Sequence, residues 1–190
     1  MIRCVLPLCA LVALAACRED GPALPAPVPM TAEAVGYYCQ MDLLEHPGPK
    51  AQVHLDGLPD PLFFSQVRDA VAYRRMPEQS GRVLAVYVSD MGVAPSWSAP
   101  GPENWIDAEA ALFVVGATLQ GGMGAPELVP FGDVAAAERF VATHGGTILP
   151  LSEIADSEVL APVELRNGAS SSDDADYEDR LRKLNPKAGG

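Results

Sequence analysis

The sequence contains a weak internal repeat, and this repeat restricts the folds open to the chain more than any other feature. The segment beginning at Phe64 aligns with the segment beginning at Phe131, an offset of 67 residues. Each half has the pattern of strand, strand, helix and strand, with alternating or continuous apolar residues in the strands and helical spacing between them. Two similar ββαβ units packed as one compact domain would make an α+β fold. A chance match between residues that are common at helix starts is the alternative explanation.

The expected elements follow from periodicity and from the residues that end helices. We expect strands at 51–55, 83–88, 110–117, 128–131 and 147–151. A helix is expected over 64–76 with Ser65 available as its N-cap, and a second one from the N-cap Asp133 to about Thr143. Pro77 ends the first helix and Gly145-Gly146 the second.

The N-terminus has the features of a lipoprotein leader. Arg3 precedes an apolar run from Val5 to Ala15 that is too short to span a bilayer as a helix. The run ends in Leu-Ala-Ala-Cys, the pattern of the bacterial lipobox, which predicts a signal peptide at 1–16 and acylation of Cys17. An ordinary secretory leader with a chance cysteine is the alternative. Arg18 is not aspartate, so the usual inner-membrane retention signal is absent, which favours the outer membrane.

Composition divides the rest of the chain into three parts. The proline-rich residues 17–35 predict a flexible tether from the lipidated cysteine, 36–165 the folded domain, and 166–190 a disordered acidic tail. The formal net charge is −12, and it becomes −13 once the leader with its single charged residue, Arg3, is removed. Nucleic acid is disfavoured as a partner because binding phosphate requires a basic surface.

The cysteine count singles out one thiol. Of four cysteines, Cys4 and Cys9 would leave with the leader and Cys17 would carry lipid, so Cys39 alone remains. A lone thiol in an oxidising compartment has no internal disulfide partner. Cys39 is therefore either buried and inert or retained for chemistry.

Sulfur donors surround this thiol in the sequence. Cys39 and Met41 lie two residues apart, and on an extended backbone they would share a face. Met123 stands among glycines in Gly-Gly-Met-Gly-Ala-Pro, which indicates a loop residue rather than core packing. Thiolate and thioether sulfur select Cu(I), so these three residues could form a trigonal site, with His46 as an additional ligand. Ordinary packing of the methionines is the alternative, and it is favoured for Met91.

Enzymatic interpretations have less support. The sequence contains no CxxC, phosphate-binding glycine loop, GxSxG or HExxH motif, and no two histidines have zinc-site spacing. A thiol enzyme that uses Cys39 as its nucleophile is formally possible, but no signature accompanies it. We therefore expect a binding protein rather than an enzyme.

The residues that carry these patterns also carry a family likeness. Over about residues 36–155 the chain resembles the NosL family in several blocks that occur in order: YYCQMDLLEHPGPKAQVHLDG, PLFFSQVRDA, MPEQSGRVLAVYVSDMG, NWIDAEAALFVVGA, GGMGAPELVPF and FVATHGGTILPL. The resemblance implies a pair of ββαβ units in a monomeric lipoprotein of the periplasmic face of the membrane, anchored by lipid alone. By position, the family's Cys-x-Met element falls on Cys39 and Met41, and its glycine-flanked methionine on Met123.

The resemblance also implies a function. A NosL-like chain would be a metallochaperone that binds one Cu(I) and passes it towards the copper centres of nitrous oxide reductase, with the associated copper-maturation ABC transporter assembly as a partner. The alternative is a metal-free lipoprotein that docks nitrous oxide reductase during assembly, in which case Cys39 would be buried packing.

Overall fold

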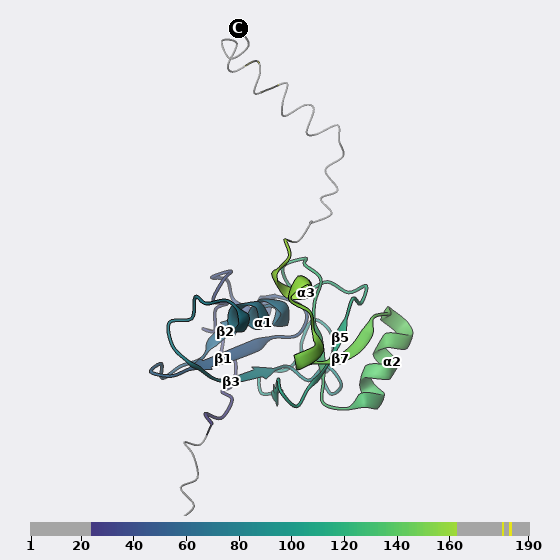
Figure 1. The fold of residues 1–190 in the computed structure, drawn as a ribbon, viewed down its shortest axis with the longest axis horizontal. Coiled ribbons are helices and arrows are strands. Elements are labelled where there is room, and N and C mark those ends of the chain that lie inside the picture. Colours follow the sequence, from purple (N-terminus) through teal and green to yellow (C-terminus); the bar gives the residue numbers. More distant parts are fainter. Residues whose placement is uncertain (1–23, 163–179, 181–182, 184–190) are drawn as a thin grey trace, which may run out of the picture.

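The computed structural model describes residues 24–162 together with residues 180 and 183. The expected leader 1–16, Cys17 and nearly all of the expected tail 166–190 lie outside the described residues. Figure 1 shows two units side by side, with the described chain beginning and ending on opposite sides of the molecule. None of the helices that the structure describes combines the length and apolarity needed to traverse a lipid bilayer.

The two units share one topology. The first contains β1 (Ala51–Leu55), β2 (Leu62–Phe64), α1 (Val67–Arg75) and β3 (Val83–Val88), and the second contains β5 (Leu112–Val115), β6 (Val129–Phe131), α2 (Val134–His144) and β7 (Thr147–Pro150). The antiparallel sheets run β2-β1-β3-β4, with β4 (Ile106–Asp107) added at the edge, and β6-β5-β7. In each unit the first strand, β1 or β5, lies between the other two strands of that unit. The predicted α+β fold of two ββαβ units is confirmed.

The starts of the two helices differ in how well the sequence predicted them. Asp133 is the N-cap of α2, as expected, and its side chain accepts a hydrogen bond from the Ala136 N–H at 2.9 Å. The first helix, in contrast, was expected from residue 64 and begins at Val67, with Gln66 rather than Ser65 at the N-cap. Phe64 instead ends β2, where it is opposite Ala51. Pairing with β1 thus overrides the helical spacing of this phenylalanine.

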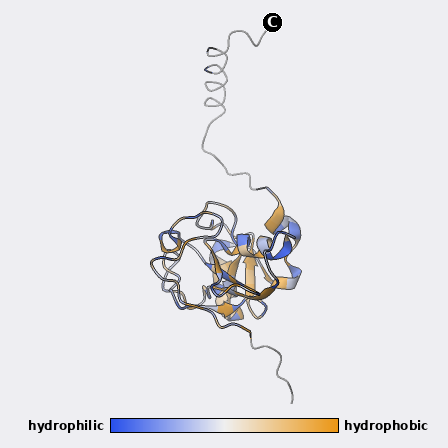
Figure 2. Ribbon diagram, turned by 90° about the vertical axis from the view of Figure 1, so that its left-hand side faces the viewer, coloured by the Kyte–Doolittle hydropathy of each residue, from blue (hydrophilic) through white to orange (hydrophobic). Residues whose placement is uncertain are grey.

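The largest apolar cluster contains residues of both units. In β5, Phe113 and Val115 contact the larger apolar cluster, which also contains Val53, Val71 and other residues of the first unit. Val114, which points the opposite way, packs beneath α2 with Phe131. This alternation is the two-residue period of a strand buried on both faces. In Figure 2 the apolar colour is concentrated on the strands inside the domain.

Residues 24–35 lie against the domain rather than forming part of a free tether. The Gln52 side chain exchanges two hydrogen bonds with the backbone of Val28, at 2.9 and 3.0 Å, and the Tyr87 hydroxyl donates to the Pro25 carbonyl at 2.7 Å. Met30 is buried. The proline content predicted the lack of regular structure, but the polar face of β1 needs partners, and this segment supplies them.

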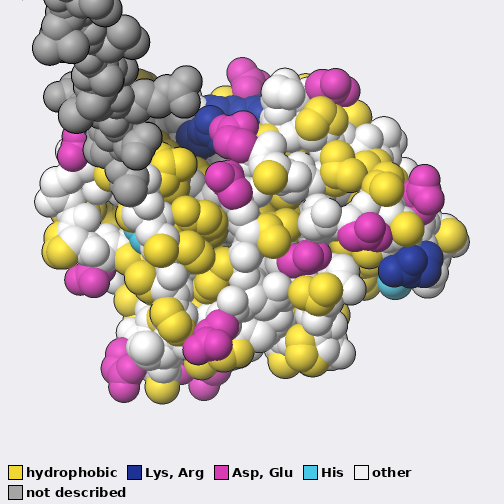
Figure 3. All heavy atoms as spheres, turned by 90° about the horizontal axis from the view of Figure 1, so that it is seen from below, with side chains coloured by type: hydrophobic (Ala, Val, Ile, Leu, Met, Phe, Trp, Pro, Cys, Tyr) yellow, Lys and Arg dark blue, Asp and Glu magenta, His cyan; other side chains and the backbone are white. Residues whose placement is uncertain are grey.

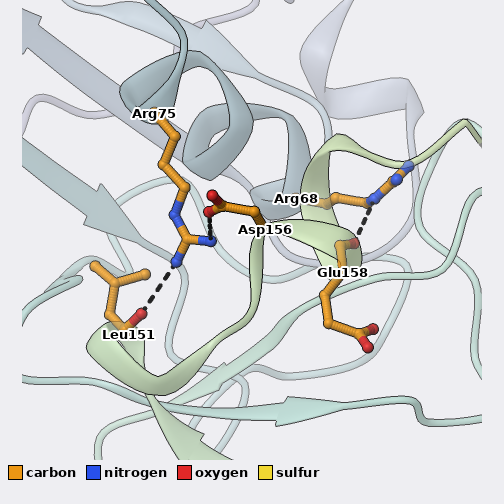
Figure 4. Close-up of polar contacts among 5 residues, drawn as sticks. All are labelled: Arg68, Arg75, Leu151, Asp156 and Glu158. Carbon is orange, nitrogen blue, oxygen red and sulfur yellow. Dashed lines mark hydrogen bonds and ion pairs between the residues drawn. The ribbon is translucent and has the colours of Figure 1, made fainter.

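The C-terminal part of the described domain is held onto the first unit by two arginines of α1 (Figure 4). The short 3-10 helix η2 (Leu151–Glu153) and the helix α3 (Asp156–Leu160) follow β7. Arg68, nearly all of which is buried, donates to the carbonyls of Glu158 at 2.9 Å and Ala161 at 2.6 Å. Arg75 donates to the Asp156 carboxylate at 2.9 Å and to the Leu151 carbonyl at 3.3 Å. The second unit is thereby fastened over α1.

A buried carboxyl group of the second unit also caps α1. Glu127 Oε1 accepts hydrogen bonds from the backbone N–H of Arg68 at 3.0 Å and of Leu128 at 2.9 Å, while its Oε2 has no hydrogen-bond partner. Burial raises the pKa of Glu127 to about 8, although the two backbone donors act in the opposite direction. The junction between the units therefore contains an acid that burial keeps largely protonated at neutral pH.

We predict that Arg68→Met will lower the free energy of unfolding by about 2 to 3 kcal/mol, because two hydrogen bonds from a charged donor are lost while the apolar stem remains. Urea denaturation of the full-length protein measures this change. Arg139→Met, on the exposed face of α2, is the matched control and should change stability little. Equal unfolding midpoints for the two variants would show that the contacts of Arg68 do not stabilise the domain.

We also predict that Glu127→Gln will flatten the pH dependence of stability. Between the ordinary pKa of 4.5 and about 8, the unfolded chain releases the Glu127 proton before the folded chain does, so the free energy of unfolding falls as pH rises. Glutamine keeps the carbonyl acceptor and has no proton to release. The stability difference between variant and parent should therefore grow in favour of the variant from pH 5 to pH 8. A difference that stays constant across this window contradicts the assigned shift.

Candidate metal centre

Cys39 lies at the tip of a closed loop, residues 34–43, which we call the Cys39 loop. Its two sides pair through a bridge between Val35 and Asp42, and the Gly36 N–H donates to the Met41 carbonyl at 3.0 Å. The chain turns between these residues, and Gln40 has a left-handed φ of 55°. The expectation of an extended backbone at Cys39 and Met41 is therefore wrong. A tight turn carries both residues, because pairing of the flanking residues forces the chain to reverse here.

Contacts with the first unit seat the Cys39 loop. Gly36 forms a parallel bridge with Phe63 of β2, and the Tyr37 N–H donates to the Phe63 carbonyl at 2.6 Å. The rings of Tyr37 and Tyr38 lie 5.3 to 5.8 Å from that of Phe64, centroid to centroid, and both rings also face Tyr73. Aromatic pairs at such separations add stabilisation beyond area burial. The two tyrosines thus attach the loop to β2 and α1 while keeping part of their surface in solvent.

Met123 lies on a second closed loop, residues 120–126, here the Met123 loop. Gln120 bridges Pro126, and the Gly121 N–H donates to the Ala125 carbonyl at 2.9 Å. Gly124 has a φ of 77°, a conformation that side-chain-bearing residues rarely adopt. The loop occupies the connection between β5 and β6, which spans residues 116–128, whereas the equivalent connection in the first unit spans residues 56–61. The Met123 loop therefore lies in a connection that is longer in the second unit than in the first.

Both loops contact the residues that precede α1. The Met123 N–H donates to the side-chain oxygen of Gln66 at 2.7 Å. Gly36 lies next to Ser65, the residue before Gln66. A Cβ built on Gly36 would lie 3.8 Å from the Ser65 Cβ and would overlap the Cys39 sulfur. Two consecutive residues of the link between β2 and α1 thus contact the two loops. The Cys39 and Met123 loops, far apart in the sequence, are attached to neighbouring positions of the first unit.

The sulfur side chains remain accessible. Met41 and Met123 are each 42% exposed, and Cys39, a free thiol, has intermediate exposure. Within the described residues no three His, Cys, Asp or Glu side chains gather as a metal site.

His46 contacts the Met123 loop. Its Nδ1 lies 3.3 Å from the Gly122 carbonyl, and because a carbonyl only accepts, Nδ1 is the donor in this contact. In the neutral ring, Nε2 then carries the lone pair, and this atom is buried without a hydrogen-bond partner. Gly122 permits the approach, because a Cβ there would lie 2.7 Å from the His46 Cβ. This tautomer leaves the lone pair of Nε2 free, as ligation of a metal requires.

Lys50 lies buried behind these loops and was not singled out by the sequence. Its Nζ donates to the carbonyls of Pro47 at 3.2 Å and Gly48 at 2.6 Å, which fixes the turn that carries His46. Burial lowers the pKa of Lys50 to about 8, and electrostatic interaction with the Glu127 side chain acts in the opposite direction when that carboxyl is ionised. A lysine directly before an apolar strand gave no indication of this role.

Met91, His54 and His144 contact other side chains of the domain. Met91 packs against the apolar cluster beneath α2. The Nε2 of His54 lies 2.9 Å from the Gln52 side-chain oxygen, and the His144 ring lies 4.6 Å from that of Phe140. On the face in Figure 3, acidic side chains are scattered among apolar ones and the basic side chains gather at two separate places.

Comparisons with known proteins place these features in a family. A family model described as NosL matches residues 27–159, a region that contains both loops. The copper-binding lipoprotein NosL of Achromobacter cycloclastes is 53% identical over 190 residues, covering 100% of this chain and 98% of that protein. The copper-binding lipoprotein NosL of Stutzerimonas stutzeri is 31% identical over 133 residues, covering 70% of this chain and 67% of that protein.

A solved structure agrees with this assignment. The crystal structure of the copper chaperone NosL from Shewanella denitrificans matches with a TM-score of 0.65 at 30% sequence identity, covering 72% of this chain and 99% of that chain. The sequence matches extend over most or all of the chain, and the structural match independently reproduces the fold. The chain therefore belongs to the NosL family.

Proposed function

We propose that this protein is a copper chaperone that carries one Cu(I) ion as cargo on Cys39, Met41 and Met123. The observation that supports the proposal is that the Cys39 and Met123 loops contact consecutive residues, Ser65 and Gln66, just before α1. Relatives named as copper-binding lipoproteins and as a copper chaperone support it. Thiolate and thioether donors suit Cu(I) because soft ligands select soft ions.

The exposure of the donors suits a carrier. A chaperone must hold its ion and still release it to a partner, and a centre open on one side lets an incoming donor bind before the first ligand leaves. Met41 and Met123 each present 42% of their surface to solvent. A closed four-donor cage, typical of structural metal sites, would not permit this exchange. His46 remains our prediction for an additional ligand.

The cellular role that we propose follows the family. The chain would be anchored by lipid on Cys17 after removal of residues 1–16 and would act as a monomer on the periplasmic side, at the outer membrane. It would pass Cu(I) towards nitrous oxide reductase through the associated ABC transporter assembly. We propose a binding role without turnover, since transfer of an ion between sulfur donors breaks no covalent bond of a substrate.

We predict that Cys39→Ser will abolish tight Cu(I) binding, because the thiolate supplies the only negative charge among the three donors. An anaerobic titration of the full-length protein with Cu(I), in competition with a colorimetric chelator, measures the affinity and the stoichiometry. The parent should bind one equivalent. Unchanged affinity in Cys39→Ser would refute the ligand assignment, and absence of binding in both proteins would favour the metal-free docking lipoprotein.

Loss of one thioether should weaken binding less than loss of the thiolate. We predict that Met41→Leu and Met123→Leu will each raise the Kd for Cu(I) by roughly 10- to 100-fold in the same competition assay, the range typical when one supporting interaction at a metal site is removed. Met91→Leu is the matched control, since Met91 is partly buried and packs against the apolar cluster beneath α2. Equal effects of all three substitutions would mean that the methionines contribute through packing and not through ligation.

A further inference from the structure

The two helices of the repeat begin at equivalent positions but use different side chains to satisfy their first N–H groups. Asp133 caps α2 in the ordinary way, with its own carboxylate. Gln66 occupies the corresponding N-cap position of α1, 67 residues earlier, and its side chain makes no capping hydrogen bond. An N-cap residue that does not cap its own helix needs another explanation.

The Gln66 side chain is used by the Met123 loop instead. It is 1% exposed, and its oxygen accepts the Met123 N–H at 2.7 Å. Gly121 allows this arrangement, because a Cβ at that position would lie 3.0 Å from the Gln66 side-chain oxygen and 2.5 Å from Glu127 Oε2. The loop thus touches Gln66 through its backbone on both sides of Gly122.

Glu127 takes over the capping that Gln66 does not perform. Its Oε1 accepts the N–H of Arg68, the second residue of α1, which is a donor that an N-cap side chain normally satisfies. Each unit therefore supplies a hydrogen-bond acceptor to the other. Gln66 of the first unit accepts from the Met123 loop, and Glu127, just after that loop, accepts from the first turn of α1. Nothing in the ββαβ fold itself requires this exchange, because α2 begins without one.

We infer that Gln66 is a positioning residue for copper binding, which fixes the backbone of Met123 so that the thioether stays beside the Cys39 loop. The inference rests on the proposed function. An exposed methionine has three freely rotating side-chain bonds, so its sulfur is held near an ion only as well as its backbone is held. The hydrogen bond from Gln66 restrains that backbone before copper arrives, which lowers the cost of ordering the third ligand.

The test compares Gln66→Leu with Asp133→Ala in the full-length protein. Leucine removes the acceptor at similar size, and Asp133→Ala removes a helix cap at the repeat-related position without touching the Met123 loop. We expect Gln66→Leu to raise the Kd for Cu(I) roughly 10- to 100-fold and X-ray absorption at the copper edge to report two sulfur ligands instead of three. Asp133→Ala should keep the parent's affinity and its three sulfurs.

A double variant separates positioning from general weakening. If Gln66 acts through Met123, then Gln66→Leu combined with Met123→Leu should bind copper no more weakly than Met123→Leu alone. Additive losses in the double variant would overturn the inference, as would parental affinity and three sulfurs in Gln66→Leu. If Met123→Leu itself binds like the parent, the proposed ligand set fails and the inference fails with it.

A measurement on the unaltered protein covers the case in which Gln66→Leu does not fold. Amide hydrogen exchange followed by NMR should find the Met123 N–H protected in the copper-free state, and protected more strongly than the Gly122 N–H of the same loop. Exchange of the Met123 amide at the rate of an unprotected one would show that Gln66 does not hold it before copper binds, and would overturn the inference.

Discussion

The contacts at the start of α1 are the constraint on which the candidate site depends. Ser65 adjoins Gly36 at the base of the Cys39 loop, and Gln66 accepts the N–H of Met123. Both residues are buried and belong to the link between β2 and α1, which pairing with β1 holds in place. Side chains on loops are placed reproducibly only when a rigid scaffold fixes the loop ends. Here two consecutive residues of the scaffold contact the two loops, so the position of this link affects both of them.

The same region carries an electrostatic cost. Burial raises the pKa of Glu127 and lowers that of Lys50, so each group is held against its preferred ionisation. Lys50 holds the carbonyls of Pro47 and Gly48, while Glu127 caps α1. Apolar side chains at these positions would avoid that cost, but they would not supply the hydrogen bonds that hold the His46 turn and cap α1. Buried ionisable groups that lower stability are expected near functional sites, where proteins commonly break such rules.

The sequence predicted the repeated parts of the fold better than the contacts between them. Asp133 carried a local capping signal, and Cys39 emerged from counting thiols. Phe64 was assigned to a helix, because three apolar residues of a short strand have no clear period of their own. The pairs of Gln66 with Met123 and of Glu127 with Arg68 join residues 57 and 59 positions apart, and no local pattern encodes such pairs. The docking of residues 24–35 was missed for the same reason: proline indicates irregular backbone and is silent about what that backbone contacts.

The most direct test of the account is NMR of the full-length protein with ¹³C-labelled methionine methyl groups, titrated anaerobically with Cu(I). The account predicts that the methyl signals of Met41 and Met123 shift together and saturate at one equivalent of copper, while those of Met30 and Met91, which pack against apolar clusters, stay in place. Movement of only one of the two signals, or saturation at different copper ratios, would contradict the claim that the Cys39 and Met123 loops hold one ion between them.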